Sequence, residues 1–277
     1  MAGDVNLPSG ASTLEVMEGA HRYNRWIYDR VRDGLGQRVL EIGCGTGTIT
    51  SFMVDRQLVV GIDVVDDYVH ATSDRFKDRP NVIIRRHDLT ESIEPLRSYR
   101  FDSAVSVNVF EHIADDERAL KAVHALLEPG GTFTLLVPSH PALLGAFDRD
   151  IGHHRRYTKG ELRRKLEASG FTVERIRRSN PVGALGWLVN VRLLGLRRLR
   201  GTGLFDRLVP AFAVLDRVEL PLGLSLIAIA RKPATGRASG DALFRQLWQS
   251  GPQRKLFEPE VVVGILDAEE PVLRGQP

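Results

Sequence analysis

Short apolar runs alternate with longer segments of helical hydrophobic periodicity between residue 38 and about residue 138. Runs rich in Val, Ile and Leu predict strands, and the mixed segments between them predict helices. Because the runs are almost continuously apolar, we expect a doubly wound α/β sheet whose parallel strands are covered on both faces. The predicted strands are 39–42, 58–62, 82–86, 101–107 and 131–137, and the predicted helices are 46–56, 66–76 and 115–127.

Outside this region the pattern is less regular. Residues 139–157 form an irregular stretch rich in His, Asp and Arg, and Thr158 three residues before Glu161 predicts a helix start. The remaining predictions are an N-terminal helix over 17–28, the helix after Thr158 to about 169, a strand over 171–177, an apolar segment dotted with arginines over 181–200, a helix over 205–218, a last strand over 222–230 and a short helix over 241–249. We therefore expect a helical lid over 1–37, a main domain over 38–232 with a helical insert at about 181–218, and a partly flexible tail over 233–277.

Composition narrows the class of protein. A chain of 277 residues with 43% hydrophobic residues can bury one full-sized core with elaborations. Its formal charge is only +3, the cations come in short clusters, and aromatic residues, at 7%, do not interleave with the arginines as a nucleic-acid platform requires. Cys44 is the only cysteine, which excludes an intrachain disulfide and, with no signal-peptide pattern at the start, favours a cytoplasmic setting.

The first predicted strand runs directly into three alternating glycines, Gly43, Gly45 and Gly47. Glycine permits positive φ and has no Cβ, so the backbone can turn sharply against a bulky ligand. The spacing is not that of the dinucleotide fingerprint, and no Gly-Lys-Ser/Thr follows as in a phosphate-binding loop. The pattern predicts a cofactor-binding turn, with an ordinary tight turn as the alternative.

This segment, Glu41-x-Gly43-x-Gly45-x-Gly47, resembles the first motif of class I S-adenosylmethionine-dependent methyltransferases. The agreement continues in the right order to about residue 231. The resemblance implies a Rossmann-like, mostly parallel seven-stranded sheet whose last strand is antiparallel, with S-adenosylmethionine as cofactor and S-adenosylhomocysteine as product. In that family the turn lies under the amino-acid end of the cofactor, which assigns to it Glu41, Gly43, Cys44, Gly45 and Gly47.

The resemblance also implies positions for the rest of the cofactor. Asp63 at the end of the second strand matches the family's ribose-binding acid, although a helix N-cap is the plainer alternative. Asp88 matches the acid that accepts a hydrogen bond from the adenine amino group, or is an ordinary loop residue. The other assigned cofactor positions are Val64 and Leu89 beside the adenine, Asn108 and Val109 under the sulfonium, and Tyr23, which with Trp26 closes a lid or simply packs in the core.

Candidate bases lie on the acceptor side, at His112 and in the segment 152–158, Gly-His-His-Arg-Arg-Tyr-Thr. This segment resembles a methyltransferase subgroup that carries Gly-His-x-Arg-Arg-Tyr-Thr, which makes His153, His154 and Tyr157 the other candidates. Arg155 and Arg156 either tie this segment down through Asp148 or Asp150 or bind an anionic substrate. The carboxylates show no obvious ligand spacing, so the sequence predicts no metal.

The predicted function is in-line transfer of a methyl group from S-adenosylmethionine to a small molecule, such as a natural-product or lipid-linked intermediate. The alternatives are an NAD-type oxidoreductase and a non-catalytic protein that keeps the cofactor fold for interaction. Residues 185–200 mix Trp and Leu with arginines. They are predicted to cap the substrate pocket or form a homodimer contact, with peripheral membrane contact as the alternative.

Overall fold

The computed structural model describes residues 19–180, 206, 209 and 223–234. Contacts divide the chain into two units, residues 1–233 and 234–277, and the fold described below is that of the first. The predicted insert over 181–218, except for Asp206 and Val209, and the predicted tail beyond residue 234 lie outside the described residues. The contacts expected of residues 185–200 with a membrane or a second copy therefore remain predictions.

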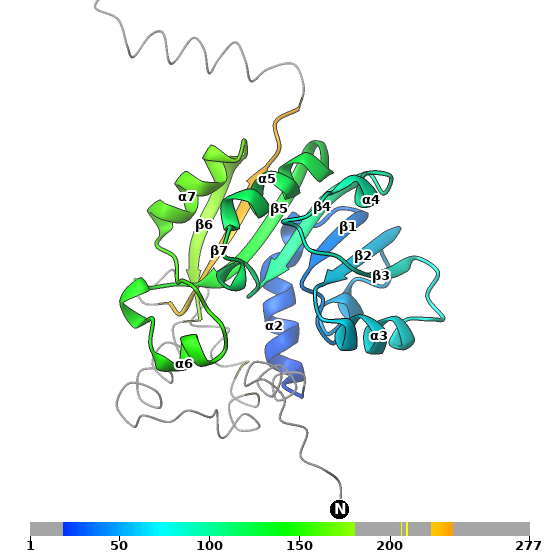
Figure 1. Cartoon of the computed structure of the whole chain (residues 1–277), viewed down its shortest axis with the longest axis horizontal. Helices are drawn as coiled ribbons and strands as arrows, with labels where there is room; N and C mark the ends of the chain where they lie inside the picture. Colours follow the sequence, from blue (N-terminus) through cyan, green and yellow to red (C-terminus); the bar gives the residue numbers. More distant parts are fainter. Residues whose placement is uncertain (1–18, 181–205, 207–208, 210–222, 235–277) are drawn as a thin grey trace, which may run out of the picture. The chain divides into compact units, whose positions relative to one another are not determined.

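A single sheet of seven strands organises the described residues, in the order β3-β2-β1-β4-β5-β7-β6. Figure 1 shows these strands side by side in that order. Strands β1 to β5 are parallel to one another, and β7 pairs antiparallel with both β5 and β6. The bounds are β1 Arg38–Ile42, β2 Leu58–Asp63, β3 Val82–Arg86, β4 Phe101–Val107, β5 Leu127–Pro138, β6 Thr172–Ser179 and β7 Ser225–Arg231. The predicted fold class, including the antiparallel last strand, is confirmed.

Helices cover both faces of the sheet because neighbouring residues along each strand point to opposite faces. On one face Leu40 belongs to a core that includes Leu120 and Leu162. On the other face Val39 belongs to a second core that includes Val31. The helices are α2 His21–Val31, α3 Asp66–Arg75, α4 Glu94–Arg97, α5 Asp116–Leu126, α6 Ala146–Asp150 and α7 Lys159–Ala168.

The predicted helix over 46–56 is wrong. Apart from the short 3-10 turn η2 (Thr50–Phe52), this segment consists of turns. Gly47 has φ of +76°, which an α-helix does not allow, and the Ser51 hydroxyl donates to the carbonyl of Thr48. Glycine and hydroxyl side chains therefore give this backbone a compact alternative to a helix.

Among the described residues, none of the helices has the length and hydrophobicity needed to cross a membrane.

Candidate active site

The loops that follow β1 and β4 meet at the carboxyl edge of the sheet. These strands are neighbours, and the chain order reverses between them, with β2 and β3 on one side and β5 on the other. A Cβ built on Gly43 would lie 2.3 Å from Cγ2 of Val109, so the two loops are in direct contact. Open parallel sheets bind ligands at such a point of reversal.

The glycine turn takes backbone conformations that other residues rarely adopt. Gly43, Gly45 and Gly47 have φ of +71°, +51° and +76°. A Cβ on Gly47 would lie 2.8 Å from Cγ2 of Thr72, and the Thr72 hydroxyl donates to the carbonyl of Gly45 over 2.7 Å. Gly47 thus lets α3 pack closely against the turn, which fixes its shape.

Glu41 and Cys44 are both buried. The Thr50 hydroxyl donates to the Glu41 carboxylate over 2.6 Å, and burial raises the pKa of Glu41 to about 8. Burial likewise raises the pKa of the Cys44 thiol. The predicted roles of these two residues toward the cofactor remain predictions.

Asp63 joins the end of β2 to the glycine turn. One carboxylate oxygen accepts a hydrogen bond from the Gly45 amide over 2.9 Å, and the other accepts one from the Val65 amide over 3.0 Å. Val64, between Asp63 and Val65 in the sequence, is 52% exposed, which is unusual for a large apolar residue in this fold. Each carboxylate oxygen keeps a second lone pair for a ligand hydroxyl, and Val64 offers an uncovered apolar surface beside it.

The loop after β3 lies next to Asp63, because the His87 amide donates to the Asp63 carbonyl over 2.9 Å. One Asp88 oxygen accepts hydrogen bonds from both the amide and the hydroxyl of Thr90, each over 2.8 Å. Leu89 is 4% exposed and belongs to the core. Asp88 thus lies in a loop that contacts the Asp63 backbone, while Leu89 anchors this loop in the core.

Asn108 ends β4 in a left-handed conformation, with φ of +54°. The Asn108 amide donates to the Leu136 carbonyl over 2.9 Å, and this hydrogen bond holds the Asn108 backbone against β5. Few non-glycine residues adopt such a φ, and those that do concentrate at functional sites. This backbone reversal directs Val109 onto Gly43.

Helix α2 carries Tyr23, whose ring centroid lies 5.6 Å from that of Trp26. Burial raises the pKa of Tyr23 to about 12. Asp206 accepts a hydrogen bond from the Tyr23 amide over 2.8 Å, so a residue distant in the sequence caps the first turn of the helix. Sequence analysis missed Asp206, because no local pattern connects it to a helix start 183 residues earlier.

Glu111, His112 and His153 form a side-chain cluster beyond Val109. Glu111 and His112 belong to the 3-10 turn η3 (Phe110–His112), and His153 comes from the segment after β5. Their ligand atoms all lie within 4.8 Å of one another. The closest measured approach is 3.7 Å, between Nε2 of His153 and Oε1 of Glu111, and the His112 and His153 ring centroids are 4.6 Å apart. The structure therefore brings together two of the predicted base candidates.

Burial affects the protonation of this cluster. Glu111 is 0% exposed, and burial raises its pKa to about 8. His112 keeps part of its surface exposed, yet the protein packed around its ring lowers its pKa to about 4, chiefly by desolvation and then through the neighbouring His153. At neutral pH the His112 imidazole is accordingly neutral and has a lone pair available.

Asp148 fixes the orientation of the His153 ring through Nδ1. One Asp148 oxygen lies 3.0 Å from Nδ1 of His153 and accepts hydrogen bonds from Nε and Nη2 of Arg156, over 2.9 and 2.6 Å. Its other oxygen accepts one from the Gly145 amide over 2.9 Å. Burial acts to raise the pKa of Asp148, but these hydrogen bonds outweigh it and hold the pKa at about 2. With Nδ1 occupied by Asp148, Nε2 of His153 points toward Glu111.

The remaining base candidates differ from His112 and His153. Tyr157 is 1% exposed and donates to Asp116 over 2.8 Å, and its pKa is raised by burial. His154 is exposed, and its amide donates to the Glu111 carbonyl over 2.8 Å. Arg156 ties the segment through Asp148 as predicted. Arg155 instead pairs with Asp116 over 2.6 Å.

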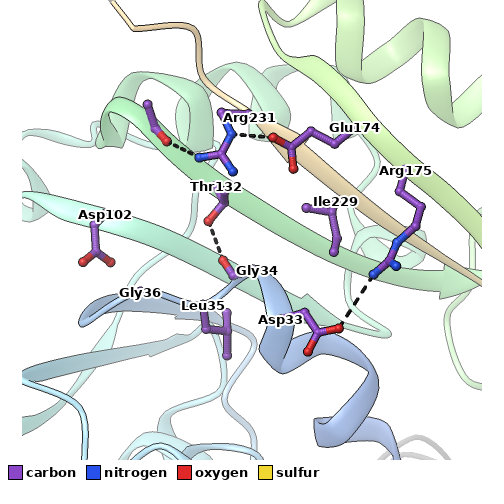
Figure 2. Close-up of a pocket in the computed structure, with 11 residues that line it drawn as sticks. Asp33, Gly34, Leu35, Gly36, Asp102, Thr132, Glu174, Arg175, Ile229 and Arg231 are labelled. Carbon is purple, nitrogen blue, oxygen red and sulfur yellow. Dashed lines mark hydrogen bonds and ion pairs between the residues drawn. The ribbon is translucent and has the colours of Figure 1, made fainter.

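A pocket of about 560 Å³ lies at the opposite edge of the sheet. Figure 2 shows two ion pairs in it, Arg231 with Glu174 and Arg175 with Asp33, while the Asp102 carboxylate accepts hydrogen bonds from the amides of Gln37 and Arg38. None of the predicted site residues lines it. This pocket therefore offers no candidate chemistry, whereas the carboxyl edge does.

Comparison with known proteins identifies the family of this fold. The pattern of the family described as "Methyltransferase domain" matches residues 18–176, more than half of the chain. A probable S-adenosylmethionine-dependent methyltransferase of Mycolicibacterium smegmatis is 33% identical over 158 residues, which cover 55% of this chain and 59% of that protein. A ubiquinone biosynthesis O-methyltransferase of Aeromonas salmonicida is 24% identical, over 53% of this chain and 68% of that protein.

A solved S-adenosylmethionine-dependent methyltransferase of Mesorhizobium loti shares the fold, with a TM-score of 0.52, 21% identity and coverage of 73% of this chain and 95% of that one. The chain spans about three fifths of the first curated relative's length. The family match and the seven-stranded sheet together support the predicted family, and the oxidoreductase alternative is not favoured. The chain belongs to the S-adenosylmethionine-dependent methyltransferase family.

Proposed function

We propose that the chain transfers a methyl group from S-adenosylmethionine to an oxygen atom of a small-molecule acceptor. The observation that carries the proposal is the cluster of Glu111, His112 and His153 at the carboxyl edge, directly after the segment that contacts the glycine turn. Oxygen acceptors usually need help to lose a proton, whereas many amines do not. An imidazole and carboxylate cluster at this edge suits an oxygen acceptor.

At the carboxyl edge of the sheet, the exposed side chains and the residues with a left-handed backbone fit the cofactor. Asp63 retains acceptor capacity for the two ribose hydroxyls, and the uncovered side chain of Val64 suits one face of the adenine. Asp88 lies on the same side for the adenine amino group. Gly43, Gly45 and Gly47 would hold the methionine end, and the backbone of Asn108 and Val109 would hold the sulfonium.

S-adenosylmethionine supplies an electrophilic methyl group on a sulfonium that leaves as a neutral thioether. The work left to the chain is to align the acceptor in line and to remove one proton. The acceptor oxygen gives up its proton at the histidine cluster while its lone pair forms the new carbon–oxygen bond. The electron pair of the carbon–sulfur bond stays on sulfur, so each turnover yields S-adenosylhomocysteine and one proton.

The acceptor class follows from the segment around the cluster and from the relatives. Several curated relatives are O-methyltransferases of ubiquinone biosynthesis, so we propose a hydroxylated natural-product or lipid-linked intermediate. His112 is exposed, which leaves the cluster open to such a molecule. Of the four predicted bases, we assign proton handling to His112 and His153. We assign Tyr157 a structural role through Asp116.

The test is methyl transfer to a panel of small phenols, catechols and hydroquinones, with product mass and S-adenosylhomocysteine measured together. His153→Gln and His112→Gln are each expected to lower kcat about 10²–10⁴-fold, the usual contribution of a positioned proton acceptor. S-adenosylhomocysteine binding should be retained in both variants.

The control is His70→Ala, which removes an exposed histidine of α3 away from the cluster and should keep the wild-type kcat. Full turnover by both cluster variants would contradict the assigned proton handling. Tight S-adenosylhomocysteine binding with no methylation of any acceptor would favour the interaction-only alternative instead.

A further inference from the structure

We propose that Glu111, His112 and His153 form a binding site for a divalent transition-metal ion of the zinc or manganese class. The proposal departs from the sequence prediction, which left metal out. It also deepens the proposed function, and to that extent rests on it, because the ion would lie where the acceptor oxygen must enter. With the ion bound, His112 and His153 would promote loss of the acceptor proton through the ion, which lowers the pKa of the acceptor oxygen, instead of taking that proton directly.

The first observation is the Glu111 carboxylate. It is 0% exposed, and among the described residues no hydrogen-bond donor reaches either of its oxygens. Burying a carboxylate without a partner is costly, so buried carboxylates are nearly always paired, hydrogen-bonded or bound to a metal. The nearest cationic candidate is His153, whose Nε2 is 3.7 Å away, too far for a hydrogen bond. A cation between these two atoms would satisfy both.

The second observation is the spacing of the ligand atoms. All three groups offer an atom within 4.8 Å of the others, and the Glu111–His153 pair is at 3.7 Å. Two ligand atoms that each lie about 2.1 Å from one ion are about 3.0–3.5 Å apart at tetrahedral or octahedral angles. Small side-chain movements therefore suffice to close the cluster on an ion.

The third observation is the way both imidazoles are already oriented. Asp148 holds Nδ1 of His153 at 3.0 Å, which leaves Nε2 as the ligand atom. Nδ1 of His112 faces Gly152, because a Cβ built on that glycine would lie 3.5 Å from it. Histidine ligands of metals usually have their second nitrogen fixed by a carboxylate or a backbone carbonyl. The buried Arg156 pairs with Asp148 and compensates its charge.

The ligand set selects the kind of ion and its accessibility. Two imidazoles and one carboxylate suit zinc, manganese, iron or cobalt, whereas magnesium and calcium prefer oxygen ligands alone. Three protein ligands leave coordination positions open, and the exposed side of His112 gives access to them. An acceptor oxygen that occupies an open position would have its pKa lowered, as water does on zinc.

The experiment uses the full chain, freed of metal with a chelator and titrated with Co²⁺ while the visible absorption of the bound ion is recorded. We expect each chain to bind one Co²⁺, with visible absorption bands typical of an ion bound by histidine nitrogens. Added Zn²⁺ should displace the Co²⁺ and abolish these bands. Glu111→Gln and His153→Gln should each weaken Co²⁺ binding at least about tenfold. His154→Ala removes an exposed histidine next to the site but outside the cluster, and should bind Co²⁺ like the wild type.

Circular dichroism and S-adenosylhomocysteine binding verify that each variant is folded. Wild-type protein that binds no Co²⁺, or Glu111→Gln and His153→Gln proteins that are folded and bind it unchanged, would overturn the metal site. Methyl transfer by chelator-treated protein at the full rate would also overturn it while leaving the proposed function intact. Co²⁺ binding at these residues in a protein that binds no S-adenosylhomocysteine would support the metal site and contradict the proposed function.

Discussion

Gly43→Ala is expected to weaken S-adenosylhomocysteine binding at least about 30-fold. The new Cβ would lie 2.3 Å from Cγ2 of Val109, and alanine would have to adopt a φ of +71°. The left-handed conformation costs an L-residue about 1–2 kcal/mol, and overpacking typically costs about 1–3 kcal/mol. Relief requires moving either the glycine turn or the segment after β4, and both line the proposed cofactor site. Isothermal titration calorimetry measures the loss.

Gly130→Ala is the matched control. Gly130 also has a positive φ, +81°, but a Cβ there would meet nothing within 4 Å. This variant should lose about 1–2 kcal/mol of folding stability from backbone strain alone and bind S-adenosylhomocysteine normally. Equal affinity losses in the two variants would mean that the contact between Gly43 and Val109 does not shape the cofactor site.

Asp148→Asn is expected to lower the free energy of unfolding by about 3–5 kcal/mol, the usual cost of removing one partner of a buried ion pair. Asp148 is fully buried and accepts hydrogen bonds from Arg156 and the Gly145 amide. The asparagine amide group would face these donors, and the guanidinium of the buried Arg156 would lose the charge of Asp148. Urea unfolding followed by circular dichroism measures the difference.

Asp55→Asn is the control for this change, because Asp55 is exposed and should shift stability by less than about 0.5 kcal/mol. A similarly small effect for Asp148→Asn would contradict the account of this segment. It would mean that the ion pair with Arg156 does not hold the segment that carries His153.

The parallel strands were predictable because their signals are local. Strand β2, for example, is a nearly continuous apolar run that ends at Asp63. The helix over 46–56 failed because its apolar spacing outweighed Gly47 in the prediction, although glycine at positive φ ends a helix.

The acceptor side was only partly predictable. His112 and His153 were predicted one at a time, but their contact with each other and with Glu111 depends on how the segment after β5 folds back. Hydrogen bonds determine that return, such as the one from the His154 amide to the Glu111 carbonyl. Tertiary contacts of this kind leave no periodicity in the sequence, so ligand spacing along the chain does not reveal the cluster of Glu111, His112 and His153.

The most direct test of the central claim is a calorimetric titration of S-adenosylhomocysteine into the wild type and Asp63→Asn. The wild type should bind S-adenosylhomocysteine and not NADH. Asp63→Asn should bind S-adenosylhomocysteine about 10–100-fold more weakly, because hydrogen bonds to a charged group contribute about 1.5–3 kcal/mol. An Asp63→Asn protein that binds S-adenosylhomocysteine as tightly as the wild type, or a wild type that binds only NADH, would contradict the account.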